Sequence, residues 1–440
     1  MPKVKVVTFG CQANELDSAR IVGILAKEGY TLTEDEREAD LVILNGCSIR
    51  EKAEQKLFSR LGTLQALKAE NPRLRLGVAG CLAQRAGAAL LRRFPYLDLV
   101  VGNGEHLAEI PQLLAIAPGQ PAVAASEPVG LFPEDTEIHR DSRVHAWVGI
   151  MEGCDNFCTF CVVPFTRGRE RSRQPDDILR EVIRLRDAGY REITLLGQTV
   201  NSYGKKLEPP VSFAELLRRI DTAVGPGIRV RFTTSYPRDV TLELAEAMAS
   251  LECVCEHIHL PVQAGSTRTL ARMERNYTRE EYLEKLALLR SAVPDLAITT
   301  DIIVGFPGET DADFAETLSL MDQVGFDSCF AFKFSPRGGT PAADLPDQVP
   351  ESLKAERLSR VQELQWRRSL DRNRALIGQA VEVLSDRELQ KRDSGLGSGR
   401  TRQNKIVHFR GESVEEGSLL DVEITDATSH HLKGVLIACA

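Results

Sequence analysis

The feature that most constrains the fold of this chain is the alternation of strand-like and helix-like segments in two long blocks. In the first block, short Val/Ile/Leu-rich runs and amphipathic stretches follow one another at 3–10, 16–30, 40–46, 51–70 and 73–80. Apolar strands separated by crossover helices are typical of a parallel sheet. Residues 1–118 are therefore predicted to form an N-terminal parallel α/β domain, and the Pro- and Gly-containing stretch 111–140 reads as a linker.

The second block repeats this alternation six times with longer helical segments. Its strand candidates lie at 144–151, 191–198, 228–235, 256–262, 296–306 and 328–335. Six strand–helix units in a row favour a partial (βα)6 barrel over 140–370, with functional residues at the C-terminal ends of the strands. A charged helix is expected at about 351–376.

The last region, 374–440, changes to short strands and Gly-rich turns. Strand candidates at 377–385, 404–409, 418–428 and 432–438 predict a small antiparallel β-barrel. The fold class is thus α/β, with a parallel N-terminal domain, a partial barrel and a small C-terminal barrel.

Three cysteines follow the first strand of the partial barrel within the segment GCDNFCTFC. Cys154, Cys158 and Cys161 have C-x3-C-x2-C spacing. A closed structural zinc site uses four ligands, usually in C-x2-C pairs, and this segment offers three at unequal spacing. Three thiolates suit a [4Fe-4S] cluster in which one iron stays open to a small molecule. The alternative is three buried structural cysteines in a loop.

A second set of cysteines is scattered along the N-terminal region. Cys11, Cys47 and Cys81 each follow a strand, in the contexts TFGC, LNGC and VAGC. Because the C-terminal ends of neighbouring parallel strands meet at one edge of a sheet, the three thiols are predicted to lie together. A second three-cysteine metal site is the inference, with packing in the core as the alternative.

The remaining cysteines and the overall composition narrow the class of protein. Cys253, Cys255, Cys329 and Cys439 lie in strand-like contexts and read as packing residues. The chain shows no signal-peptide pattern and no apolar stretch of about 18 residues, so it is predicted to be cytoplasmic, without contact to membranes. Ten reduced cysteines in that compartment favour metal binding over disulfides. The net charge of −8 restricts any RNA binding to local patches.

Several long motifs carry a resemblance to a known family. They are GCQANELDS (10–18), NGCSIREKAEQKLFSRLG (45–62), GCDNFCTFCVVPFTRGRERSR (153–173), GQTVNSYG (197–204), HLPVQAGS (259–266), DIIVGFPGET (301–310) and FSPRGGTPA (334–342). With them the chain resembles the radical SAM methylthiotransferases, in particular the tRNA-modifying MiaB type. The C-terminal barrel resembles a TRAM domain, an RNA-binding module.

The resemblance implies a function, which we state as an expectation. The chain would add a methylthio group to C-2 of the isopentenylated adenosine next to the anticodon of tRNA. Two [4Fe-4S] clusters and S-adenosyl-L-methionine would be its cofactors, with Cys154, Cys158 and Cys161 holding the radical-generating cluster and Cys11, Cys47 and Cys81 the cluster that holds the sulfur. Expected partners are tRNA, an electron donor such as flavodoxin or ferredoxin, and a sulfur or iron–sulfur carrier, with the chain itself a monomer.

Further site residues follow by analogy with the family. Gln198 and Asn201 are expected to bind the amino group of S-adenosylmethionine, and Gly305 is expected to approach its adenosine. The alternating arginines of TRGRERSR, which an extended backbone would place along one face, are predicted to contact RNA phosphates; they are Arg167, Arg169, Arg171 and Arg173. In the C-terminal barrel, Arg400, Arg402 and Lys405 are predicted RNA contacts near Phe409. The alternative for both groups is a solvated charged surface.

Three other functions remain open at this stage. The chain could modify an aspartate of a ribosomal protein, since that branch of the family shares the cysteines. It could act on a different adenosine modification of tRNA. It could also be an iron–sulfur scaffold that binds RNA without catalysis, although GQTVNSYG and DIIVGFPGET argue against a carrier because a carrier needs no S-adenosylmethionine pocket.

Overall fold

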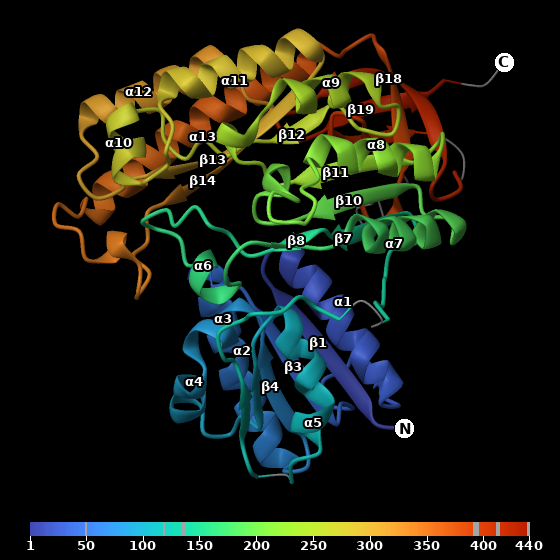
Figure 1. Ribbon diagram of the computed structural model, residues 1–440, viewed down its shortest axis with the longest axis vertical. Helices are drawn as coiled ribbons and strands as arrows, with labels where there is room; N and C mark the ends of the chain where they lie inside the picture. The colour runs from blue at the N-terminus through green and yellow to red at the C-terminus, as the bar shows by residue number, and fades with distance from the viewer. Residues whose placement is uncertain (49–50, 118, 134–136, 390–395, 411–413, 438–440) are drawn as a thin grey trace.

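The computed structural model describes residues 1–48, 51–117, 119–133, 137–389, 396–410 and 414–437. Figure 1 shows an N-terminal domain below a larger strand–helix domain, with the C-terminal barrel beside the latter. The three-part architecture agrees with the fold class predicted from the sequence. Cys439, predicted as a packing residue, lies outside the described residues.

The N-terminal domain is a six-stranded parallel sheet in the order β2-β1-β3-β4-β5-β6. The strands are β1 (Lys3–Phe9), β2 (Thr31–Leu32), β3 (Leu41–Gly46), β4 (Arg75–Ala79), β5 (Leu99–Val101) and β6 (Ala122–Ala124). Strand β6 lies within the stretch predicted to be only a linker. Pairing with β5 supplies hydrogen bonds that the Pro/Gly pattern around it did not reveal.

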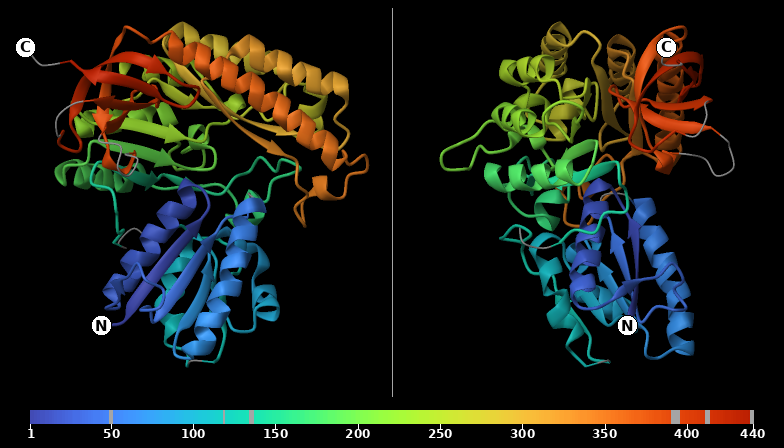
Figure 2. Two further views of the ribbon diagram at one scale, coloured as in Figure 1. Left: turned by 180° about the vertical axis from the view of Figure 1, so that it is seen from behind. Right: turned by 90° about the vertical axis from the view of Figure 1, so that its right-hand side faces the viewer.

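Helices cover both faces of this sheet (Figure 2). They are α1 (Gln12–Lys27), α2 (Glu51–Glu70), α3 (Cys81–Ala86), α4 (Ala88–Arg93) and α5 (Ile110–Leu114). Alternate residues of β1, β3, β4 and β5 belong to two separate apolar cores: Ile43 packs with α1 and α5, whereas Leu44 packs with α2 and α3. This two-sided burial explains the nearly continuous apolar strands in the sequence.

The central domain is a partial barrel of six parallel strands. They are β7 (His145–Gly149), β10 (Glu192–Leu196), β11 (Arg229–Thr233), β12 (His257–His259), β13 (Ala297–Val304) and β14 (Ser328–Lys333). Hydrogen bonds join them in the orders β11-β10-β7 and β12-β13-β14. A parallel bridge between Val230 and Val254 joins the two halves beside β11 and β12.

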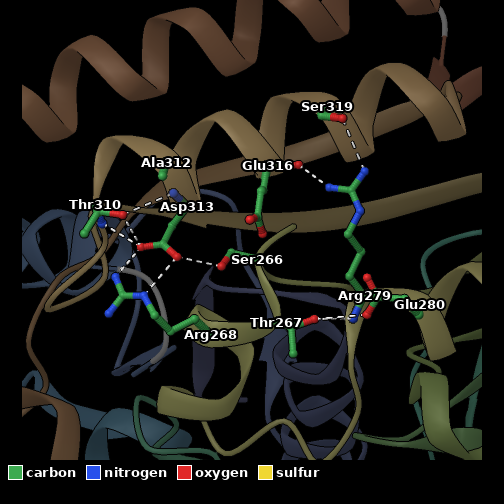
Figure 3. A pocket seen from close by; sticks show the side chains of 10 residues that line it. All are labelled: Ser266, Thr267, Arg268, Arg279, Glu280, Thr310, Ala312, Asp313, Glu316 and Ser319. Atoms are coloured by element: carbon green, nitrogen blue, oxygen red, sulfur yellow. Dashed lines mark hydrogen bonds and ion pairs between the residues drawn. The ribbon is translucent and has the colours of Figure 1, made fainter.

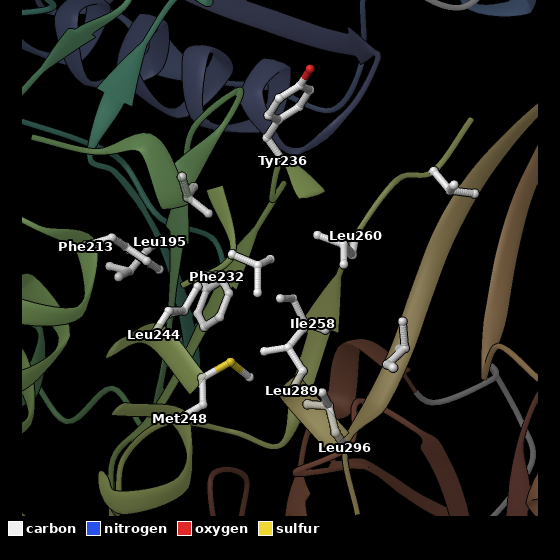
Figure 4. Close-up of a cluster of buried hydrophobic side chains, with 14 of the residues drawn as sticks. Leu195, Phe213, Phe232, Tyr236, Leu244, Met248, Ile258, Leu260, Leu289 and Leu296 are labelled. Carbon is white, nitrogen blue, oxygen red and sulfur yellow. The ribbon is translucent and has the colours of Figure 1, made fainter. Parts of the chain in front are cut away.

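Helices surround the outer side of these strands. They are α7 (Pro175–Asp187), α8 (Phe213–Val224), α9 (Leu242–Ser250), α10 (Thr267–Arg272), α11 (Arg279–Ala292), α12 (Asp311–Val324) and α13 (Glu351–Arg374). The short helix α6 (Val163–Thr166) instead lies against α3 of the N-terminal domain. A short antiparallel pair, β8 (Met151–Glu152) and β9 (Arg171–Ser172), lies beside β7. The main apolar core fills the space between helices and strands, with Leu195, Phe232 and Ile258 near its centre (Figure 4).

The inner face of the partial barrel is polar. Side chains of Ile193, Val230 and Ile298 enter the core on the outer face. The residues that alternate with them, among them Glu192, Arg231 and Thr299, therefore point to the inner face, because neighbouring strand residues point to opposite sides. Near the N-terminal ends of the strands this face contacts the C-terminal barrel, where Arg231 donates to the Arg402 and Thr401 carbonyls at 2.7 Å.

The C-terminal domain is a closed five-stranded barrel in the order β15-β16-β17-β19-β18. The strands are β15 (Ala380–Ser385), β16 (Gly397–Thr401), β17 (Ile406–Arg410), β18 (Leu419–Ala427) and β19 (Leu432–Leu436). Two details differ from the prediction: β16 occupies the stretch expected to be a Gly-rich turn, and β17 pairs with β19 in parallel. Gly397 is needed there for packing, since a Cβ would lie 2.3 Å from the Phe409 ring.

The described part of the chain contains no helix that is both long enough and apolar enough to span a bilayer.

Candidate metal centres

The loop that carries Cys154, Cys158 and Cys161 begins directly after β8. Gly153 starts it with φ +81°, and a Cβ there would lie 2.1 Å from the Arg169 carbonyl oxygen. Its N–H donates to Gln198 Oε1 at 2.6 Å. Glycine is therefore required for the sharp exit from the strand, and the three thiols follow in the loop between β8 and α6.

Each thiol of this loop accepts a hydrogen bond. Asn156 Nδ2 donates to Cys154 Sγ at 3.3 Å, Arg275 Nη1 donates to Cys158 Sγ at 3.2 Å, and the Val163 N–H donates to Cys161 Sγ at 3.5 Å. Burial raises the pKa of the Cys161 thiol to about 12. Donors aimed at the sulfurs favour the charged thiolate that burial disfavours, and thiolate is the form that binds iron.

Arg275 is a site residue that sequence reasoning missed. It is buried, its guanidinium lies 4.7 Å from the Tyr236 ring centre and 5.2 Å from that of Tyr277, and Nη2 donates to the Pro261 carbonyl at 3.1 Å. No local motif marks it, because the contact forms only when the turn between α10 and α11 meets the cysteine loop. It fixes the position of Cys158 relative to the end of β12.

The scattered cysteines come together at the edge of the N-terminal sheet. Cys11, Cys47 and Cys81 follow β1, β3 and β4, which are neighbours in the sheet. A hydrogen bond with Cys47 is the main cause that lowers the pKa of Cys11 to about 5, and burial raises the pKa of Cys81. Cys11 and Cys81 also interact electrostatically. Cys11 thus interacts with both of the other thiols at this edge of the sheet, the arrangement on which the predicted metal site depends.

Arg167 reaches into this group from the other domain. Its Nη2 lies 2.6 Å from Asp17 Oδ2, both side chains are at most 5% exposed, and its charge acts on Cys11 and Cys81. Asn103 Nδ2 makes a second link, donating to Cys81 Sγ at 3.4 Å and to the Thr166 carbonyl at 3.0 Å. The thiol group therefore lies at the contact between the two domains.

The predicted row of exposed arginines is wrong for two of its four members. Arg167 is buried as described, and Arg173 is buried against Glu181 at 2.8 Å and the Gly149 carbonyl at 2.6 Å. Arg171 is partly buried and donates to the Pro128 and Arg167 carbonyls. Arg169 is exposed, 2.8 Å from Asp155. The extended backbone assumed for this segment exists only over β9, so the side chains do not share one face.

The three residues expected to contact S-adenosylmethionine lie near the loop but have protein partners. Asn201 is buried and exchanges two hydrogen bonds with the Tyr236 backbone, at 2.7 and 2.8 Å. Gly305 has φ +69°, donates to Glu309 Oε1 at 2.9 Å, and faces the Lys354 side chain, which a Cβ would meet at 2.3 Å. Gln198, bonded to Gly153, is half-buried beside the loop.

The basic residues predicted to make the C-terminal barrel an RNA surface instead face the partial barrel. Arg402 pairs with Glu256 at 2.8 Å and donates to the Val254 carbonyl, and Lys405 pairs with Asp327 at 2.8 Å. Arg400 is mostly buried, and its carbonyl accepts from Arg229 at 2.6 Å. The turn between β16 and β17 therefore covers the N-terminal ends of the barrel strands, which corrects the expectation of a free basic loop.

A surface pocket of about 680 Å³ lies between α10, α11 and α12 (Figure 3). Its arginines are engaged: Arg268 pairs with Asp313, and Arg279 donates to the Glu316 carbonyl at 2.6 Å. The C-terminal end of α10 meets the cysteine loop, where the Arg272 carbonyl accepts from Thr159 Oγ1 at 3.0 Å, whereas the pocket lies at the N-terminal end of this helix.

The donor chemistry of both groups fits an iron–sulfur cluster. Each offers three thiols, the soft ligands that iron–sulfur clusters use, and N–H donors point at several of the sulfurs. Within the described chain, no three His, Cys, Asp or Glu side chains stand close enough to hold a single metal ion. A four-iron cluster is larger than one ion and takes its ligands from a wider circle.

Comparisons with known proteins cover almost the whole chain. Residues 148–321 match the radical SAM superfamily, residues 3–102 match an uncharacterized protein family, UPF0004, and residues 374–437 match the TRAM domain. The tRNA-2-methylthio-N(6)-dimethylallyladenosine synthase of Carboxydothermus hydrogenoformans is 48% identical, covering 98% of each chain. Proteins of that name from Moorella thermoacetica and Thermoanaerobacter sp. (strain X514) are 47% identical over 98% of this chain and 98% and 92% of their own.

Solved structures show the same fold at low sequence identity. The radical S-adenosylmethionine methyltransferase TsrM from Kitasatospora setae, with cobalamin and a [4Fe-4S] cluster bound, aligns with a TM-score of 0.57 and 17% identity over 78% of this chain and 74% of its own. The cobalamin-dependent S-adenosylmethionine radical enzyme OxsB aligns with a TM-score of 0.53 and 14% identity, and the match spans 83% of this chain but only 56% of OxsB.

Proposed function

The chain belongs to the family of tRNA-2-methylthio-N(6)-dimethylallyladenosine synthases, and from that premise we propose how its parts divide the reaction. It is a radical SAM transferase that uses a [4Fe-4S] cluster and S-adenosylmethionine. The proposed reaction replaces the C-2 hydrogen of the isopentenylated adenosine next to the anticodon by a methylthio group. Residues 140–370 would perform the radical step, and residues 1–118 would hold the sulfur. Residues 374–440 would contribute to the surface that binds RNA.

Two clusters are proposed, one for each thiol group. Cys154, Cys158 and Cys161 would hold the cluster on which S-adenosylmethionine is bound, and Cys11, Cys47 and Cys81 the second. When bound, these groups supply the one-electron chemistry that an aromatic C–H requires, since such a carbon offers no acidic proton for general-base catalysis. Two sets of three thiols, each leaving one coordination position without a cysteine, support this assignment.

The surrounding residues hold the sulfurs and exclude water. Arg275 joins Cys158 to the end of β12, and Asn201 positions Tyr236, whose Oη donates to the Arg275 carbonyl. Arg167 and Asn103 hold the N-terminal group against the partial barrel. Gln198 remains the residue best placed to meet S-adenosylmethionine, because it already borders the loop. Gly305 and Asn201 would contribute indirectly, by fixing the shape of the loops that follow β13 and β10.

The wider partners follow from the same proposal. The substrate would be tRNA, approached by exposed groups such as Arg169. An electron donor such as flavodoxin or ferredoxin would reduce the first cluster, and a sulfur or iron–sulfur carrier would restore the second. The enzyme would work in the cytoplasm as a monomer.

The observation that carries the proposal is the placement of both thiol groups at the contact between the N-terminal domain and the partial barrel. Arg167, six residues beyond Cys161, pairs with Asp17, six residues beyond Cys11. Transfer of sulfur to a carbon activated by the other site requires such proximity. A carrier of clusters has no need for a second, differently built site within the same junction.

The decisive experiment is nucleoside analysis of tRNA from a strain that lacks the gene. The methylthio adenosine should be absent and its isopentenyl precursor should accumulate; the wild-type gene should restore it, and a Cys158→Ala copy should not. An unchanged nucleoside profile together with an unmodified ribosomal-protein aspartate would transfer the function to the protein-modifying branch of the family. If neither the tRNA nucleosides nor the ribosomal-protein aspartate differs between the deletion strain and wild type, the chain would be an iron–sulfur scaffold without this enzymatic activity.

A further inference from the structure

An aromatic side chain lies exposed on the inner face of the partial barrel. Phe330 is 51% exposed, although β14 is one of the six barrel strands. Its register partner is Asp301 on β13, and residues paired in a parallel sheet point to the same side. Ile302, the next residue of β13, is fully buried in the core on the outer side. Phe330 and Asp301 therefore both face inward.

A histidine lies beside these two residues, and we call Phe330, Asp301 and His259 together the wall. His259 ends β12 and pairs in register with Thr299, so it shares the inner face. Its Nδ1 lies 3.0 Å from Thr299 Oγ1 and its Nε2 lies 3.6 Å from Asp301 Oδ1, which orients the ring. The His259 and Phe330 ring centres are 6.0 Å apart at an interplanar angle of 76°. A half-exposed aromatic ring thus stands beside an oriented imidazole and a carboxylate.

The strand that ends at His259 is tied to one thiol group, and β7, in the other half of the barrel, is tied to the other. Two residues beyond His259, the Pro261 carbonyl accepts from Arg275, which also donates to Cys158. On the inner face of β7, the first strand of the other half of the barrel, Trp147 hydrogen-bonds Glu15, four residues from Cys11. The end of β12 is therefore tied to one thiol group and the inner face of β7 to the other.

We propose that this wall binds the purine base that the enzyme modifies: Phe330 stacks on the ring, and the Asp301–His259 pair hydrogen-bonds its polar edge. This proposal rests on the proposed function and names residues that select the substrate. Exposure alone would not mark Phe330 as a binding residue, but its ring is half-exposed on the inner face and stands beside the oriented His259 ring and the Asp301 carboxylate. A purine offers a flat π-face for stacking and N–H and N groups at its edge, which is the combination that the wall presents. The base has to leave its RNA stack to reach the wall.

The test uses the full-length, cluster-reconstituted enzyme and an anticodon stem-loop RNA that carries the isopentenylated adenosine. Phe330→Ala should raise KM for this RNA about 10- to 100-fold, in line with the loss of one base-stacking contact. Phe330→Tyr should stay within a few-fold of wild type, because its ring stacks equally well. Asp301→Asn should raise KM while iron content stays unchanged. The control is Leu242→Ala on the outer helix α9, where the leucine is 57% exposed.

A second readout separates this proposal from the proposed function. In an RNA with 2-aminopurine at the target position, fluorescence should be quenched on binding to wild type and much less on binding to Phe330→Ala. If wild type quenches the probe but forms no methylthio nucleoside on the separate RNA that carries the isopentenylated adenosine, the proposed function fails and the base site stands. If Phe330→Ala matches Leu242→Ala in both KM and quenching, the base site is refuted while the methylthiotransferase function is untouched.

Discussion

The two thiol groups are built in opposite ways. Cys154, Cys158 and Cys161 lie in one loop, whose course is set by Gly153 and by hydrogen bonds to each sulfur. Cys11, Cys47 and Cys81 come from three strand ends and meet only after the sheet has formed. The first group is a local structure, whereas the second is a product of tertiary folding.

This difference extends to the charge around the sulfurs. In the loop, burial raises the pKa of Cys154 and takes that of Cys161 to about 12. In the N-terminal group, a hydrogen bond with Cys47 and the charge of Arg167 bring the pKa of Cys11 down to about 5. The N-terminal thiol group, which is assembled from distant segments, is therefore stabilised in part by the charge of an arginine from another domain. Its integrity should therefore depend on the domain contact more than that of the loop does.

The largest expected effect comes from removing each set of thiols separately. Reconstituted wild type should hold about eight irons, as two four-iron clusters require. Replacing all three loop cysteines by Ala should halve the iron and abolish reductive cleavage of S-adenosylmethionine. Replacing Cys11, Cys47 and Cys81 by Ala should also halve the iron, yet leave that cleavage and abolish only the methylthio product. Iron analysis and chromatography of 5′-deoxyadenosine measure both.

Cys253→Ala serves as the control, because this buried cysteine lies in the main core and should leave the iron content unchanged. Suppose that wild-type protein holds only about four irons and that replacing the N-terminal cysteines does not change this number. The N-terminal thiols would then hold no cluster, and the two thiol groups could not be compared as metal sites.

Breaking the link between the domains should have the next largest effect. Arg167→Met leaves the buried Asp17 carboxylate with Arg20 alone, 3.4 Å away, and breaking a buried ion pair costs up to about 3–5 kcal/mol. Arg169→Met removes an exposed pair with Asp155 and should cost about 0–1 kcal/mol. Hydrogen exchange of α1 and α6 in the two variants measures the free energy of opening the domain contact. Equal protection in both would show that the junction does not depend on this ion pair.

Replacing a glycine that precedes one of the scattered cysteines should have a smaller effect on stability. Gly80 has φ +86°, and a Cβ there would lie 2.1 Å from Asn45 Oδ1. Gly29 has a similar φ of +82° but no atom within 4 Å of its Cβ position. Gly80→Ala should therefore destabilise the N-terminal domain by about 1–3 kcal/mol more than Gly29→Ala, because only the former also overpacks its surroundings. Thermal unfolding of both variants gives the difference, and equal melting temperatures would mean that backbone strain alone limits these turns.

The smallest effect concerns the amide donors at the sulfurs. Asn103→Ala removes a bond to Cys81 and leaves the buried Thr166 carbonyl without that donor, a loss of about 1–3 kcal/mol. Asn156→Ala removes only the bond to Cys154, worth about 0.5–1.5 kcal/mol. Both variants should lower the reduction potential of the nearby cluster, since hydrogen bonds to sulfur favour the reduced state. Potentiometric titration followed by EPR tests this, and a raised potential in either variant contradicts it.

The sequence predicted what depends on local motifs and on strand order. The loop cysteines share one motif, and the scattered ones share a context that parallel-sheet topology brings to one edge. Six barrel strands and the closed C-terminal barrel followed from periodicity. The sequence pattern does not indicate strand β6, because the strand is only three residues long and is recognisable only through its pairing with β5.

Contacts between separately folded parts could not be predicted. The basic neighbours of Arg167 and Arg402 in the sequence predict contacts with RNA, yet each arginine is paired with a carboxylate from a distant segment. Arg275 has no motif at all and is recognisable only through its bond to Cys158. Charge along a chain indicates the partners available to a residue, but the packing of domains decides which partner it takes.

The burial of Asp17 has a consequence for how such proteins can evolve. The carboxylate is fully enclosed, and its bond to Arg167 reaches it from a domain 150 positions further along the chain. Grafted onto a different barrel, the N-terminal domain would lose the partner that lies 2.6 Å from this carboxylate and keep only Arg20, 3.4 Å away. Recombination between genes would then yield working hybrids only when both halves of this pair are inherited together.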